Sequence, residues 1–243
     1  MRRWTWTCLA FLGTVAHAQS DPGLYLYEIE LVGGEGTTFS GSSLVVDLVV
    51  QDSDRLSQAL GNTTVALQTS GDRGLRVTLG GNDHFKGKPD RSLASSSWVV
   101  DFDEQSVQSL LQSLSESSTT GEEVLPREIT RFTYDQISDK HYRNGFDIAS
   151  QVADSLQGDC TEHAVLNAAL VRANGYPARV VLGVLILFGE QGVVAAGHAW
   201  NEIYYQDTWH IHDATLPLEN ADVQRVFYLP LNPLADEGPG YAM

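Results

Sequence analysis

The chain has few cysteines, few basic residues and no long apolar run. It holds 2 cysteines and 15 Lys and Arg residues, against 31 Asp and Glu residues, in 243 residues. The formal net charge of −16 repels phosphate groups, so we expect neither nucleic acid nor an anionic membrane surface as a partner. No segment supplies the roughly 20 consecutive apolar residues of a transmembrane helix. The length allows one large domain or two small ones.

The first 18 residues are typical of a secretory signal peptide, with an uncleaved anchor as the alternative. Two arginines precede a short apolar stretch, and Ala16-His17-Ala18 supplies small residues two apart. Cleavage after Ala18 removes Cys8 and leaves 13 basic against 31 acidic residues, a formal charge of −18. We therefore expect a secreted or periplasmic protein. Cys160 is then its only cysteine, which excludes an internal disulfide and indicates either intermolecular pairing or a reactive thiol.

The remaining chain changes pattern near residue 120, and together its parts predict an α+β fold. Residues 19–120 form a β-rich accessory region in which branched and aromatic runs alternate with Gly, Asn and Asp. Strands are predicted over 24–32, 44–50, 63–68, 75–79 and 98–102, followed by a helix over 103–115 and a polar linker over 115–123. Residues 121–235 form a second predicted domain, and 236–243 are a C-terminal tail. This domain is predicted to hold helices over 128–140, 148–156 and 160–173, a strand over 180–188, and a hairpin of 199–205 and 208–214.

Cys160 is predicted to be the first residue of a helix. Asp159 is a favourable N-cap, and Glu162 three residues later completes a capping-box pattern. At that position the free backbone N–H groups and the helix dipole stabilise a thiolate, and the same N–H groups are suited to an oxyanion. The alternative is a small, inert residue at a helix start, which is the commoner role of a free cysteine.

His198 and Asp213 are predicted to lie on one face of the hairpin. If Gln206-Asp207 forms a two-residue turn, Tyr205 pairs with Thr208, and His198 and Asp213 become diagonal neighbours roughly 7–8 Å apart at the backbone. A carboxylate there accepts from one imidazole nitrogen and leaves the other to face a thiol. A turn one residue longer or shorter would place the two side chains on opposite faces.

Two further histidines raise the question of a metal. His210 and His212 form His-x-His, which occurs in metal sites, and Cys160 and His198 are the additional ligands such a site would recruit. We expect no metal and no cofactor, because no fourth partner is evident.

Other polar residues near the cysteine have ordinary structural explanations. We expect Glu162 and His163 to serve helix capping and packing. Gln151 and Gln157 are the candidates for a second oxyanion donor.

Four ordered blocks resemble the transglutaminase-like superfamily, which has the papain-like cysteine-enzyme fold. They are Gly158-Asp159-Cys160-Thr161-Glu162-His163-Ala164, Ala173-Asn174-Gly175-Tyr176-Pro177-Ala178-Arg179-Val180-Val181, Gly197-His198-Ala199-Trp200-Asn201-Glu202 and Trp209-His210-Ile211-His212-Asp213-Ala214-Thr215. The resemblance implies a nucleophilic Cys160, a general-base His198 and an orienting Asp213. It also implies that a helix carrying the cysteine packs on an antiparallel sheet carrying the other two.

The chain departs from the animal cross-linking members of this superfamily. They have Gln directly before the cysteine, where this chain has Asp159, and they have calcium sites, whereas no calcium loop is evident here. The resemblance is nearer to bacterial exported members. We therefore expect an exported thiol enzyme that acts on protein or peptide amides, by hydrolysis or by acyl transfer to an amine. The alternative is an inactive module that binds a peptide or a partner; no oligomeric state is predicted.

Overall fold

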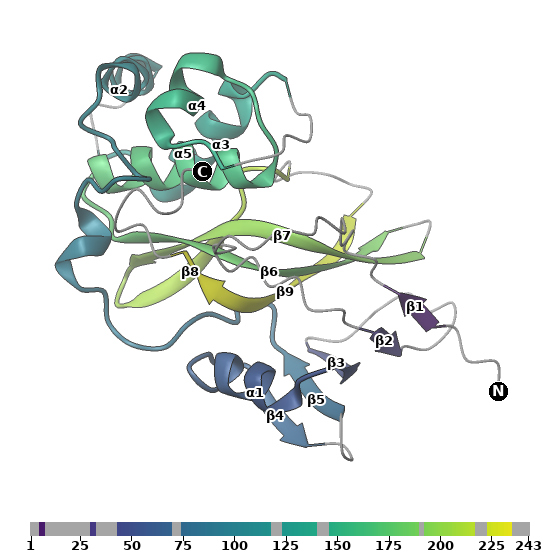
Figure 1. The fold of residues 1–243 in the computed structure, drawn as a ribbon. Helices are drawn as coiled ribbons and strands as arrows, with labels where there is room; N and C mark the ends of the chain where they lie inside the picture. The colour runs from purple at the N-terminus through teal and green to yellow at the C-terminus, as the bar shows by residue number, and fades with distance from the viewer. Residues whose placement is uncertain are drawn as a thin grey trace, which may run out of the picture. The chain divides into compact units, whose positions relative to one another are not determined.

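The protein folds into two compact units, each assembled from separate stretches of the chain. The computed structural model describes residues 5–7, 30–32, 43–69, 74–117, 123–139, 146–189, 192–216 and 223–234. Unit 1 comprises Met1–Lys86, Gly183–Gly197 and Ala221–Asn232, and unit 2 comprises Gly87–Leu182, His198–Asn220 and Pro233–Met243. Helices and antiparallel strands are both present (Figure 1), so the predicted α+β class is confirmed.

Unit 1 contains a sheet with the strand order β1-β2-β3-β5-β4. The strands are β1 (Thr5–Thr7), β2 (Glu30–Val32), β3 (Leu44–Val49), β4 (Ala66–Thr69) and β5 (Gly74–Leu79), and each neighbouring pair is antiparallel. On β5 the buried residues Leu75, Val77 and Leu79 alternate with more exposed ones, as expected for a half-buried strand. The strands predicted over 44–50, 63–68 and 75–79 are therefore confirmed, with ends that differ by a few residues.

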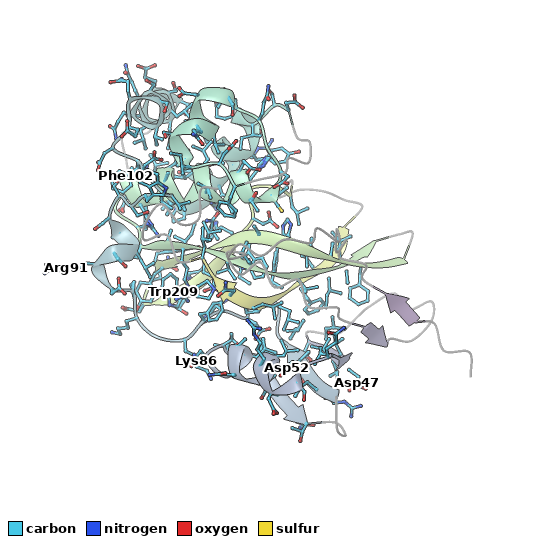
Figure 2. The ribbon with its side chains drawn as sticks, viewed as in Figure 1. Asp47, Asp52, Lys86, Arg91, Phe102 and Trp209 are labelled. Carbon is cyan, nitrogen blue, oxygen red and sulfur yellow. The ribbon has the colours of Figure 1, made fainter. Side chains whose placement is uncertain are left out.

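Helix α1 (Ser53–Gly61) of unit 1 is not predicted from the sequence. The Asp52 carboxylate caps it by accepting from the Arg55 N–H at 2.9 Å (Figure 2). Leu56 and Leu60 are its buried residues, and both belong to the core of the unit. Two apolar residues one turn apart in a polar stretch give too weak a period to indicate a helix.

In unit 2 three helices surround a fourth. They are α2 (Gln105–Ser117), α3 (Pro126–Gln136) and α4 (Ala149–Ser155) around α5 (Cys160–Ala173), and the short 3₁₀ helix η1 (Arg91–Ala94) precedes them. Every residue from Glu162 to Arg172 is buried, as expected of a helix that is enclosed on all sides. The predicted helices are confirmed, with ends that differ by a few residues.

A second sheet has the strand order β8-β7-β6-β9. Its strands are β6 (Ala178–Gly189), β7 (Gly192–Tyr205), β8 (Thr208–His212) and β9 (Val223–Pro233). Ala178, Val180, Ala199 and Ile203 share the core of unit 2 with α5. The predicted packing of the cysteine-bearing helix on a sheet is therefore confirmed. Strand β9 is not predicted, because its prolines argue against a strand; it lies at the sheet edge, where proline is tolerated.

The β7–β8 hairpin has the predicted register. Tyr205 pairs with Thr208 and Asn201 pairs with His212 in an antiparallel ladder. The turn residues Gln206 and Asp207 have φ values of 52° and 63°, which is the conformation of a two-residue type I′ turn. This register sets which side chains of the two strands share a face.

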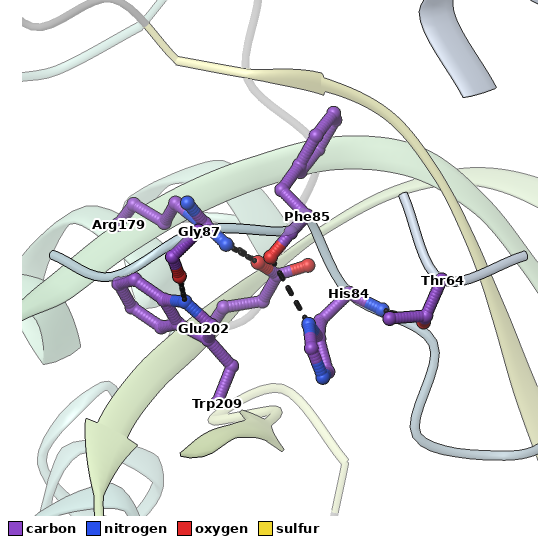
Figure 3. A network of polar contacts seen from close by, with 7 residues as sticks. All are labelled: Thr64, His84, Phe85, Gly87, Arg179, Glu202 and Trp209. Atoms are coloured by element: carbon purple, nitrogen blue, oxygen red, sulfur yellow. Dashed lines mark hydrogen bonds and ion pairs between the residues drawn. The ribbon is translucent and has the colours of Figure 1, made fainter. Parts of the chain in front are cut away.

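A buried ion pair ties the strands of unit 2 together. Arg179 of β6 and Glu202 of β7 approach to 2.6 Å, and the Arg179 guanidinium lies 3.8 Å from the centre of the Trp209 ring. The Trp209 indole donates to the Gly87 carbonyl at 2.7 Å (Figure 3). Removing one partner of such a pair leaves a buried charge uncompensated, so these contacts hold β6, β7 and β8 in one arrangement.

The strand predicted over 98–102 is wrong. Bends and a turn occupy these residues, although Val99 and Val100 are buried as a strand would bury them. The Val99 carbonyl accepts from the Ala149 N–H at 2.9 Å, and the Asp101 carboxylate accepts from the Ser150 N–H at 2.8 Å. The segment is a connector that hydrogen-bonds the start of α4 and does not pair with a strand.

The described residues test only part of the predicted organisation. Apart from β1, the predicted signal peptide and residues 24–29 of the first predicted strand lie outside the described residues, as do 118–122 of the predicted linker and the tail 236–243. The compact units divide the chain between Lys86 and Gly87, and α2 belongs to unit 2. The ranges 1–18, 19–120 and 121–235 stay predictions. None of the described helices is long and apolar enough to cross a membrane.

Candidate functional site

Cys160 is the first residue of α5, as predicted. The Asp159 carboxylate accepts from the Thr161 N–H at 2.9 Å, and the Glu162 carboxylate accepts from the Asp159 N–H at 2.9 Å, which completes the capping box. The His163 N–H donates to the Asp159 carbonyl. The cap therefore uses the amides that follow Cys160, and the Cys160 N–H itself is not part of it. The thiol is partly buried.

The capping residues leave no room for a side chain at Gly158. A Cβ atom built there lies 2.3 Å from Cβ of Glu162 and 2.5 Å from its Cγ, and the backbone φ is +151°. Glu162 is 1% exposed, and Asp147 and Asp159 both donate backbone N–H groups to its carboxylate. Burial raises the pKa of Glu162, against the lowering effect of the hydrogen bond from Asp159. Gly158 and Glu162 thus determine together how the chain enters α5.

His198 and Asp213 are in contact. Nε2 of His198 lies 2.7 Å from Oδ2 of Asp213, and their side chains are 8% and 5% exposed. The other carboxylate oxygen of Asp213 accepts from the Thr215 N–H at 2.9 Å. The ring of Trp200 stacks against that of His198, with centroids 6.4 Å apart. These contacts fix the imidazole plane and leave Nδ1 as its remaining nitrogen.

His198 also hydrogen-bonds Cys160, so the structure brings the three predicted site residues together. Burial favours the neutral imidazole, but the hydrogen bonds to Asp213 and Cys160, and the charges of both groups, outweigh it and raise the pKa of His198 to about 10. A ring held between a carboxylate and a sulfur can take one proton from the sulfur and return it without a large movement. This arrangement is suited to nucleophilic attack by sulfur.

The other candidates have structural partners. His163 Nδ1 donates to the Asp159 carbonyl at 2.6 Å, and Glu162 is in the capping box, so capping and packing are confirmed for both. Gln151 is exposed on α4, and Gln157 pairs with Asp139 in an isolated bridge. Neither glutamine has a recorded contact with the thiol within the described part of the chain.

His210 and His212 do not meet Cys160 and His198 in a metal-binding group. Among the described residues, no cluster of three or more His, Cys, Asp or Glu side chains is arranged to hold a metal. His210 pairs with Ile203 across the hairpin and stacks on Tyr205 with centroids 4.0 Å apart. His212 instead contacts the buried polar groups of Thr130 and Tyr205.

His212 is held neutral by its surroundings. Its Nδ1 lies 3.1 Å from Thr130 Oγ1, and Tyr205 OH lies 3.2 Å from its Nε2. The Thr130 hydroxyl donates to the Pro126 carbonyl, so Nδ1 carries the proton and Nε2 accepts from the tyrosine. Burial, with the nearby charge of His210, lowers the pKa of His212 to about 4.

His212 is expected to make the protein sensitive to acid. Its folded pKa of about 4 lies below the ordinary 6.5, so its contribution to stability is complete above pH 6.5 and is lost as pH falls through 4. This difference between the folded and unfolded pKa corresponds to about 3 kcal/mol of the free energy of unfolding. Urea unfolding of wild type and His212→Gln between pH 7 and 4 measures it. Because carboxylates titrate in the same window, the difference between the two proteins is the signal, and equal pH slopes would contradict the assignment.

Sequence reasoning missed two buried amides, Asn167 of α5 and Asn201 of β7. Both are 0% exposed, and they are hydrogen-bonded to each other at 2.8 Å. Asn167 is a polar residue inside an otherwise apolar run, which is a sequence signal, whereas Asn201 is followed by Glu202 and shows no such signal.

Part of the chain matches a known protein family. Residues 109–214 match the transglutaminase-like superfamily, which confirms the resemblance noted in the sequence. Similar solved structures include a protein from Cytophaga hutchinsonii proposed to be a cysteine protease, with 15% identity, 76% of this chain and 69% of that chain covered, and a TM-score of 0.40. The periplasmic domain of TgpA from Pseudomonas aeruginosa bound to ethylmercury has 17% identity, 72% and 73% coverage and a TM-score of 0.43. Red sea bream transglutaminase has 12% identity, 75% and 49% coverage and a TM-score of 0.35. No curated protein matches the chain in sequence.

Proposed function

We propose, from the transglutaminase-like core of residues 109–214 and the contacts around Cys160, that this chain is a thiol enzyme acting on amide carbonyls of proteins or peptides. The observation that carries the proposal is the position of His198, which hydrogen-bonds Cys160 on one side and Asp213 on the other. A structural cysteine has no need of a buried imidazolium held by a carboxylate.

In the proposed reaction, the Cys160 sulfur attacks the carbonyl carbon and forms a tetrahedral intermediate. Its oxyanion is placed to accept from the Cys160 N–H, at the positive end of α5. His198 holds the proton that came from the thiol and donates it to the leaving amine as the C–N bond breaks. A thioacyl intermediate remains on Cys160, and Asp213 keeps the imidazole in one orientation throughout.

The second half of the proposed reaction runs in reverse with a different nucleophile. His198 removes a proton from water or from an amine, which attacks the thioacyl carbon, and the proton passes to the departing sulfur. Water gives hydrolysis, and an amine gives acyl transfer. We favour hydrolysis, in an exported protein, because water is always present while an acceptor amine needs a binding site of its own. Export itself rests on the proposed signal peptide of residues 1–18.

A comparison of wild type and Cys160→Ala against glutamine-containing peptides, with and without added amine, tests the function. We expect wild type to convert substrate and Cys160→Ala to lose all thiol-dependent conversion. Ammonia release indicates an amidase, new amide bonds indicate a transferase, and shorter peptides indicate a protease. Equal behaviour of the two proteins in every assay would contradict the enzyme and favour a binding module.

A further inference from the structure

A line of buried polar groups joins α5 to β7. The amide of Asn167 donates to Oδ1 of Asn201 at 2.8 Å, and the amide of Asn201 donates to the Ala164 carbonyl, also at 2.8 Å. Ala164 lies one turn after Cys160 on the helix, and Asn201 lies three residues after His198 on the strand. Two hydrogen bonds therefore connect the nucleophile's helix to the base's strand.

The same polar groups reach α3 and β8. The Thr133 hydroxyl donates to Oδ1 of Asn167 at 3.1 Å, and the Asn167 amide lies 3.4 Å from Thr130 Oγ1. Thr130 Oγ1 is in turn 3.1 Å from Nδ1 of His212, the residue directly before Asp213. The connected groups therefore include residues of α5 and β7, which carry the proposed nucleophile and base, and the last residue of β8, which precedes the proposed orienter.

The free energy of folding alone does not require amide side chains at positions 167 and 201. Both asparagines are 0% exposed, and replacing a buried hydrogen-bonded pair by apolar groups of the same shape is often neutral. Apolar packing is not directional and permits small slides between elements, whereas hydrogen bonds restrict both distance and angle. A polar network in which each member has a partner specifies one arrangement of the elements it joins.

Register between these elements matters for the proposed chemistry. Reacting groups need to be held within about 0.5 Å of their productive positions, and a displacement of about 1 Å can lower a rate roughly 100-fold. A slide of α5 along β7 would move the Cys160 sulfur relative to the imidazole, without exposing any of the core.

We propose that the Asn167–Asn201 pair and Thr130 form a positioning network, which sets the register of α5 against β7 and β8. They act through the elements they join and not by contact with substrate. The proposal rests on the proposed function for its meaning in catalysis, but the register itself has readouts of its own.

The double variant Asn167→Leu/Asn201→Leu tests the network. Leucine is close to asparagine in shape, and the change leaves other partners in place: the Thr133 hydroxyl keeps the Ile129 carbonyl at 3.0 Å, and the Thr130 hydroxyl keeps the Pro126 carbonyl at 2.8 Å. We expect cooperative unfolding at a urea concentration near that of wild type. In the same protein, iodoacetamide labelling of Cys160 at pH 6 should fall at least fivefold, with Cys8→Ser in every protein compared.

A loss of labelling that merely reflects looser packing would also appear in a matched control. Ser106→Ala removes the 3.0 Å hydrogen bond from Ser106 to the Ser150 carbonyl, which joins α2 to α4 in the same unit. We expect its labelling rate to stay at the wild-type value. Wild-type labelling in the double leucine variant, or an equal loss in Ser106→Ala, would overturn the proposal.

A second pair of variants decides the matter if the double variant does not fold. Thr130→Val removes the hydroxyl that faces His212 and keeps the shape, while Thr130→Ser keeps the hydroxyl. We expect slower labelling in the valine variant and rescue in the serine variant. Equal rates in these two proteins would overturn the network.

The His198 ring separates failure of the network from failure of the proposed function. If wild type labels no faster than His198→Ala, the proposed activation of the thiol is wrong. NMR titration of His198 then tests the positioning network separately. A ring pKa that falls from about 10 toward that of a free imidazole in the double leucine variant supports the network. An unchanged ring pKa overturns it.

Discussion

At pH 6, His198→Ala is expected to slow the labelling of Cys160 by iodoacetamide at least tenfold. A free thiol with a pKa of about 8.5 is only about 0.3% thiolate at this pH. In wild type, an imidazolium whose pKa is raised to about 10 stays charged at pH 6 and hydrogen-bonds the sulfur, so a positive charge lies beside the atom that reacts. Wild type should therefore also react faster than a free thiol.

Labelling reactions quenched at successive times and analysed by mass spectrometry measure these rates. All proteins carry Cys8→Ser, so that Cys160 is the only thiol. His210→Ala is the matched control, because it removes an imidazole that stacks on Tyr205. Its rate should equal that of wild type. Asp213→Asn should give a smaller loss than His198→Ala, since the imidazole remains but its carboxylate partner is gone. Slow wild-type labelling that is indifferent to His198 would show that the thiol is not activated.

Gly158→Ala is expected to destabilise the protein by about 3 kcal/mol, through overpacking and an unfavourable backbone conformation. The added methyl group would lie 2.3 Å from Cβ of Glu162, and Glu162 cannot swing away without breaking the hydrogen bond from Asp159. Either the glutamate or the start of α5 has to move. Because that start carries Cys160, labelling at pH 6 should slow as well.

Gly175→Ala is the matched control for this substitution. Gly175 has a φ of +86°, and nothing lies within 4 Å of a Cβ built there. It therefore tests the backbone cost alone, about 1 kcal/mol, and should leave labelling unchanged. Urea unfolding and labelling of the two variants are compared directly. Similar losses of stability in both would mean that the contact with Glu162 does not matter.

Local features of the site were predictable because their causes lie within a few residues. Asp159 and Glu162 indicate the helix start directly, since a capping box spans only four positions. Gln206-Asp207 between two β-like runs indicates a two-residue hairpin, and the hairpin register then places His198 and Asp213 on one face. Weak or mixed local signals explain the errors. Helix α1 has too few apolar residues to show a period, and Val99-Val100 is buried without being a strand.

The sequence by itself determined the start of the Cys160 helix and the hairpin register, because capping and turn chemistry act within a few residues. Its four motif blocks carried the resemblance to the transglutaminase-like superfamily. Only the tertiary structure decided which nitrogen of His198 bonds Asp213, that the imidazole reaches Cys160, and that Asn167 meets Asn201. These contacts join residues 15 to 38 positions apart in the chain. They depend on how α5 packs against β7 and β8, and residue spacing does not encode that distance or angle.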